Sequence, residues 1–134
     1  MVKLDYKYGL PFCQVSLVYK GKSVTLDNVL LDTGSGGSVF KMDKVDEIGI
    51  TIEDDDTIDT ISAVGGIEFV YNKNIDGISI GNLELRNFTI EVGVMDYGFE
   101  VNGILGMDFM KGIGAIIDLD KMIIYNKSKT YDGV

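Results

Sequence analysis

The sequence predicts an all-β fold in which short strands close into a barrel-like domain. Strand-forming Val, Ile, Tyr, Phe and Thr are plentiful, and turn signals recur at close intervals along the 134 residues. Gly is frequent, at 17 residues, whereas Pro occurs once, which indicates tight turns and close backbone approaches. The expected segments add up to about eight to ten short strands and one or two short helices, the pattern of a closed all-β domain.

The first half of the chain is expected to begin with a hairpin. A strand over residues 12–19 turns at 20–22 and returns over 23–26, and a separate apolar run, 28–31, stops at Asp32. Residues 33–38 then form a polar, Gly-rich loop. Apolar residues near helical spacing predict a short helix within 41–50, which Gly49 can cap.

The second half predicts further hairpins. The acidic stretch 52–60 is interpreted as a solvated loop, because three consecutive Asp residues are strongly hydrated. The segments that follow are a hairpin over 61–71 with Gly65 and Gly66 near its turn, a second over 75–80 and 83–94 with Gly81 and Asn82 at its turn, an apolar run at 101–105, a helical turn at 108–112, and a last hairpin over 115–119 and 122–125. The length fits one domain over residues 1–134, with its core at about 12–126 and a polar C-terminal tail.

Charge and composition exclude several functions. A net charge of −9 makes nucleic acid and anionic membranes poor partners, because both attract basic surfaces. The absence of His removes Ser-His and Cys-His catalysis and the common zinc sites. The single Cys13 excludes an internal disulfide and fits a reducing compartment or a buried small side chain. No apolar run approaches the ~20 residues of a membrane span, and no signal peptide is visible, so a cytoplasmic location without metal or cofactor is expected.

The most informative stretch runs from Val29 to Ser35. An apolar strand delivers Asp32 to the point where the strand ends. Thr33 supplies a hydroxyl that can tie the loop to a neighbouring backbone, and the Gly34 amide can reach a carboxylate. Ser35 can hydrogen-bond the outer oxygen of that carboxylate. A phosphate-binding loop is disfavoured, because no Lys follows at the required spacing.

This loop resembles the active-site loop of retropepsin-like aspartic proteases, bacterial members included, in which Asp-Thr-Gly-Ser or Asp-Thr-Gly-Ala follows an apolar run. Three further features occur in the family's order: Val39-Phe40 followed by the short helix; a Gly-bearing hairpin at the family's flap position, comprising Ala63, Val64, Gly65, Gly66 and Ile67; and an apolar-apolar-Gly element that is expected to thread beside the catalytic loop, comprising Gly103, Ile104, Leu105 and Gly106. A plain hairpin turn at 63–67 is the alternative to a flap. Asn102 departs from the family, which often carries Asp there, and the flap has fewer Gly residues than many viral relatives.

The resemblance implies an aspartic endopeptidase in which Asp32 is catalytic. The family's mechanism needs two facing carboxyl groups, and none of Asp76, Asp108, Asp118 or Asp120 repeats the sequence pattern around Asp32. Two copies of Asp32 in a homodimer would supply the pair, because an isologous dimer places identical residues face to face. The implied partner is a peptide or protein substrate. A catalytically silent domain of the same fold, used for dimerisation or peptide binding, is the alternative.

Overall fold

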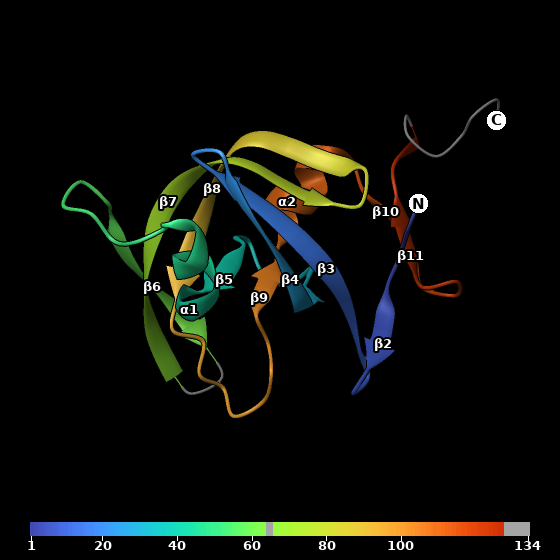
Figure 1. Cartoon of the computed structure of the whole chain (residues 1–134). Helices are drawn as coiled ribbons and strands as arrows, with labels where there is room; N and C mark the ends of the chain where they lie inside the picture. The colour runs from blue at the N-terminus through green and yellow to red at the C-terminus, as the bar shows by residue number, and fades with distance from the viewer. Residues whose placement is uncertain (64–65, 128–134) are drawn as a thin grey trace.

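The computed structural model describes residues 1–63 and 66–127, with the side chain of residue 63 left out, and these residues are mostly β-structure (Figure 1). This confirms the predicted all-β class. The elements in chain order are β1 Val2–Lys3, β2 Asp5–Lys7, β3 Leu10–Tyr19, β4 Lys22–Leu31, β5 Val39–Lys41, α1 Met42–Val45, the 3₁₀-helix η1 Asp46–Ile48, β6 Ile58–Ala63, β7 Gly66–Ile80, β8 Leu83–Gly93, β9 Gly103–Leu105, α2 Met107–Ile113, β10 Ile116–Asp118 and β11 Ile123–Tyr125.

Two sheets organise the described strands. The larger has the order β2-β3-β4-β9-β5-β8-β7-β6, and β3 also pairs with β7, so the ladder from β3 through β4, β9, β5, β8 and β7 returns to β3. Most pairings are antiparallel, but β4–β9 and β5–β8 are parallel. The smaller sheet, β1-β11-β10, stands to one side and brings the N-terminal strand against β11 (Figure 1).

Strand β4 corrects the first predicted hairpin. The segments 23–26 and 28–31 are one strand with a bulge, since Cys13 lies opposite Val29 whereas Val15 lies opposite Leu26. Asn28 adopts a left-handed φ of 55° at the bulge. Asn is common in turns because it tolerates this conformation, so the sequence there resembles a turn. Beyond the bulge the strand continues to Leu31 and delivers Asp32.

The remaining sequence predictions are largely confirmed. The helix within 41–50 is α1 followed by η1, and it ends at Gly49 with a φ of 83°. The hairpin that turns at Gly81 is β7 and β8, and the last hairpin is β10 and β11. One correction is that β7 is a single strand that spans parts of two predicted hairpins. The strands β1 and β2 were not predicted, although Val2, Leu4 and Tyr6 alternate with charged residues, which is the pattern of a strand.

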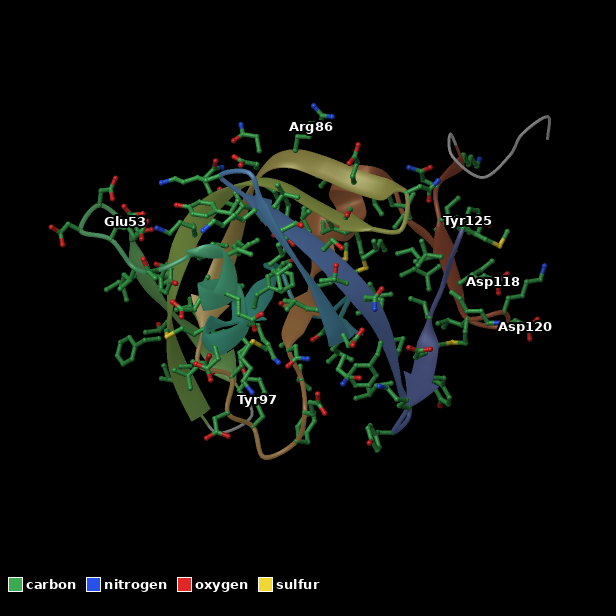
Figure 2. All side chains as sticks on the ribbon, viewed as in Figure 1. Glu53, Arg86, Tyr97, Asp118, Asp120 and Tyr125 are labelled. Atoms are coloured by element: carbon green, nitrogen blue, oxygen red, sulfur yellow. The ribbon has the colours of Figure 1, made fainter. Side chains whose placement is uncertain are left out.

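The prediction that the acidic stretch 52–60 is a solvated loop needs a correction, because two of its carboxylates form ion pairs. Lys73 of β7, whose side chain is 5% exposed, forms ion pairs with Asp56 at 2.6 Å and Glu53 at 2.9 Å. The hydrogen bonds from Lys73 lower the pKa of both carboxyl groups. Burial opposes the charge on Lys73, but the same two bonds outweigh it and raise the pKa of that amine. Glu53 projects from the loop that leads into β6 (Figure 2).

The apolar core fills the space inside the larger sheet and under α2. Leu31, Phe40, Leu105 and Phe109 are buried within it, so the strand ends next to Asp32 rest on packed side chains. Phe109 of α2 also meets Phe88 of β8 edge to face, with ring centroids 6.2 Å apart. None of the described helices has the length and apolar character needed to cross a bilayer.

Candidate active site

Asp32 lies where β4 ends against β9. Its backbone amide donates to the Leu105 carbonyl at 3.0 Å, which continues the parallel pairing of Leu31 with Leu105. Its Oδ1 accepts a hydrogen bond from the Gly34 amide at 2.8 Å, the contact expected from the sequence. Its carbonyl accepts from the Ser35 amide at 3.2 Å, closing a turn. The Asp32 backbone is therefore fixed on both sides, and its half-buried carboxyl group accepts one backbone hydrogen bond.

The loop after Asp32 is fixed by the start of α2. The amides of Met107 and Asp108 donate to the carbonyls of Ser35 and Gly36 at 2.7 and 3.2 Å. A side chain at Gly106 would be impossible without a shift, because its Cβ would lie 2.2 Å from the Gly37 carbonyl oxygen. The Gly-rich loop and the apolar-apolar-Gly element thus pack backbone against backbone.

A buried serine joins these two segments. Ser38, 1% exposed, accepts from the Gly106 amide at 2.9 Å and donates to Asp108 Oδ1 at 2.7 Å. Sequence reasoning missed this residue, because a serine in a Gly-rich loop looks like any solvated turn residue. The strand-forming Val39 and Phe40 directly after it are the available signal that Ser38 already enters the core.

Two predicted loop residues make contacts other than those expected. The Ser35 hydroxyl donates to the Gly37 carbonyl at 2.7 Å and not to the Asp32 carboxylate. This bond still stabilises the loop, since it closes the segment 35–37 on itself. Thr33 is exposed, and within the described part of the chain its hydroxyl has no hydrogen-bond partner.

A cleft of about 460 Å³ opens beside Asp32. Apolar side chains dominate its walls, and among the described lining residues only Asp32 and Glu91 carry a charge. The lining consists of Leu30, Asp32, Gly34, Ser35, Gly36, Gly37, Val39, Ile61, Ser62, Glu91, Tyr97, Phe99, Val101 and Ile104. An apolar cleft with few polar groups is the usual form of a ligand-binding site.

One wall of the cleft is the connection 94–102, which is fastened to β7. Glu68 of β7 accepts from the Met95 amide at 3.2 Å and from the Tyr97 hydroxyl at 3.0 Å. Burial, and then the bond to Glu68, raise the pKa of Tyr97 to about 12, so the hydroxyl remains a donor. Tyr97 lies at the end of the molecule opposite Arg86 (Figure 2). Sequence reasoning missed these two residues, because their pairing depends on the register between β7 and this connection.

The predicted flap is described in part. Ala63 ends β6 and pairs with Gly66 at the start of β7, and Ile67 is 77% exposed. Val64 and Gly65 lie outside the described residues. Ile61 and Ser62 of the same hairpin line the cleft, so the hairpin borders the candidate site, and the flap role stays a prediction.

The apolar-apolar-Gly element lies beside the loop. Gly103 packs under Phe40, whose Cδ1 would lie 2.6 Å from a Cβ at that position. Ile104 lines the cleft and Leu105 is fully buried. Asn102, the departure noted in the sequence, donates its side-chain amide to the Asp27 carbonyl at 2.8 Å and its backbone amide to the Asn28 carbonyl at 3.0 Å. It therefore supports the bulge in β4 and does not contact Asp32.

Comparison with known proteins points the same way as this geometry. The sequence model of the aspartyl protease family matches residues 15–109, a span that runs from β3 to the start of α2 and includes Asp32. A search of the curated proteins finds no match to the chain. Because the family match covers more than half of the sequence, the chain belongs to the retropepsin-like aspartyl protease family.

Proposed function

We propose that the chain is an aspartic endopeptidase, and that its active site forms in a homodimer from two Asp32 carboxyl groups, one from each subunit. The observation that carries this proposal is the position of Asp32, held by backbone hydrogen bonds at the end of an apolar strand and at the edge of a cleft. The family membership supports a peptidase. In this proposal residues 1–134 form one closed, barrel-like domain per subunit.

The proposed chemistry uses one shared proton. As is established for aspartic-protease dyads, two carboxyl groups about 3 Å apart cannot both ionise. The ionised group accepts a proton from a bound water, whose oxygen attacks the scissile carbonyl carbon. The protonated group donates its proton to the carbonyl oxygen. In the collapse of the tetrahedral diol, the pair gives its proton to the nitrogen, the C–N bond breaks, and one hydroxyl of the diol returns a proton to the pair as the new carboxylic acid forms.

The lining of the cleft supports a contribution from a second chain. Glu91 is the other charged side chain among the described lining residues, and it lies near the C-terminal end of β8 without an Asp-Thr-Gly loop. Exposed Thr33, which follows Asp32 in the chain, and the 42% exposed Met107, which lines a surface pocket with Thr33, would be covered by a second copy. These features favour an isologous contact centred on the Asp32 loop.

Cleavage of a pooled peptide library, with and without pepstatin, tests the function. The wild type should cleave peptides in a pepstatin-sensitive manner, and Asp32→Asn should abolish cleavage while preserving the thermal midpoint, because Asn is isosteric but cannot exchange the proton. Asp54→Asn makes the same chemical change on the exposed acidic loop and should leave cleavage intact. Binding of peptides without any cleavage would favour the silent domain, and substantial turnover by Asp32→Asn would contradict the assignment of Asp32.

A further inference from the structure

Glu91 is a carboxylate in the cleft without a partner. Among the described residues neither of its side-chain oxygens has a hydrogen bond or an ion pair. Other acidic side chains with comparable burial are satisfied, as Glu68 is by Tyr97 and Asp108 is by Ser38. A half-buried carboxylate without these bonds is less favourably solvated than one at the open surface, so it is available to accept from a donor that enters the cleft.

The position of this carboxylate is fixed by the sheet. Glu91 pairs with Val39 of β5 on one side and with Asn72 of β7 on the other, and its amide donates to the Ser38 carbonyl at 2.9 Å. Its Oε1 lies over Gly37, where a Cβ would come within 2.4 Å of it. The carboxylate therefore occupies space that a side chain of the active-site loop would otherwise fill.

The two charged groups that shift the pKa of Glu91 are both carboxylates. Burial raises the pKa of Glu91, and the neighbouring carboxylates of Asp59 and Asp108 raise it further. Asp32 lines the same cleft, and none of the described lining residues is Lys or Arg. A cation brought into the cleft would gain a charge-assisted hydrogen bond and would relieve this repulsion.

We propose that Glu91 is a specificity-determining residue that selects peptide substrates with a Lys or Arg side chain in the stretch that occupies the cleft. The inference rests on the proposed protease function and adds a substrate class to it. The apolar walls, among them Ile61 and Phe99, accommodate the methylene stem of a long basic side chain while its charged end reaches Glu91.

Paired peptides test this selection. Each pair differs at one position near the cleaved bond, which carries Lys in one peptide and norleucine in the other, so that length is kept and charge is removed. The wild type should favour the Lys peptide by about tenfold in kcat/KM at one such position. Glu91→Gln should bring that ratio close to one, and Glu91→Asp should retain part of the preference. Glu84→Gln, an exposed change on the same strand, should leave the ratio as in the wild type.

Binding provides a readout that does not need turnover. Asp32→Asn should bind the fluorescent Lys peptide more tightly than the norleucine peptide, and Asp32→Asn combined with Glu91→Gln should bind both alike.

Equal cleavage and equal binding of both peptides by proteins with intact Glu91 would overturn the inference and leave the proposed protease function intact. A weaker dimer in Glu91→Gln with an unchanged Lys preference would also overturn it, since Glu91 would then pair with the second copy. Cleavage that survives Asp32→Asn would instead overturn the proposed function.

Discussion

At the residue scale, Asp32 depends on groups that lie about seventy positions further along the chain. The Leu105 carbonyl accepts the hydrogen bond from the Asp32 amide, and the first amides of α2 donate to the loop carbonyls. Gly106 is the point of closest approach, because two backbone carbonyls stand within 2.7 Å of where its Cβ would be. The geometry of the candidate catalytic group is therefore set by this backbone contact as much as by the Asp-Thr-Gly triplet.

Gly106→Ala should separate the loop from α2. The added methyl group meets rigid backbone, so we expect a loss of about 1–3 kcal/mol in the free energy of unfolding, together with a loss of peptide cleavage. Gly36→Ala is the matched control, because a Cβ at Gly36 meets nothing within 4 Å. Urea denaturation of both variants measures the effect, and equal midpoints for the two would contradict the close approach at Gly106.

The sequence predicted part of this site. Asp32 and the Gly34 amide contact follow from local order, since both lie within three residues of one another. Ser38, Glu68 and Glu91 could not be predicted in the same way, because each acquires its neighbours from the register between strands that are distant in sequence. A polar residue in an apolar strand was the available signal for Glu91, but the same signal marks many solvent-facing positions.

At the element scale, β4 shows why a turn signal can stand inside a strand. Asn28 has the left-handed conformation that is typical of a turn, so the sequence predicts that the strand ends there. The strand continues because the Asn102 side chain and backbone amide donate hydrogen bonds to the bulge. The lengths of β4 and β7 could not be predicted for this reason: local signals divide each into two pieces, and long-range pairing joins them. The short helix and the turns at Gly49 and Gly81 depend on local φ preferences, and these were predicted.

Asn102→Asp should weaken the bulge. An ionised Asp cannot donate to the Asp27 carbonyl, and its charge would be buried, since residue 102 is 5% exposed. We expect a loss of about 1–3 kcal/mol in the free energy of unfolding at neutral pH. A protonated Asp can donate, so the loss should shrink in mild acid. Urea denaturation at both pH values measures this, and an undiminished stability at neutral pH would contradict the donor role of Asn102.

The Lys73 ion pairs predict how the loop 51–57 responds to acid. The folded-state pKa values of Glu53 and Asp56 lie below their ordinary values of 4.5 and 3.8, so these groups stabilise the fold at higher pH. That contribution is lost as the pH falls through the lowered folded values. Lys73→Met should lower the urea midpoint at neutral pH, and the gap to the wild type should narrow in acid. The exposed Lys121→Met is the control, and a gap that is independent of pH would contradict the ion-pair account.

At the scale of the whole molecule, one chain offers one Asp32 and a net charge of −9. In the proposed homodimer two copies approach despite this repulsion, so association should strengthen as acid protonates carboxylates. The family's two-carboxyl chemistry also needs a proton on the pair. Mild acid is therefore expected to favour both dimer association and the singly protonated form of the proposed pair. Stronger acid should protonate both Asp32 carboxyl groups, and no carboxylate then remains to accept a proton from water.

Specific activity should fall on dilution, and it should have a mildly acidic optimum. Dimerisation is a mass-action equilibrium, so dilution below its dissociation constant leaves monomers that lack the second Asp32. Initial rates and sedimentation velocity on the same dilution series measure both quantities, at neutral and at mildly acidic pH. Full activity in samples that sediment as monomers would contradict the two-chain active site.

The pairing of β4 with β9 also sets the order of events during synthesis. Asp32 leaves the ribosome long before Leu105, yet its amide bond and the ladder beside it require residues 103–105. The contact between Ser16 and Ser79 that joins β3 to β7 is similarly remote. Such long-range closure is slow and follows the completion of most of the chain. A nascent chain that still lacks residues 103–105 therefore carries Asp32 without the backbone contacts that position this residue in the folded chain.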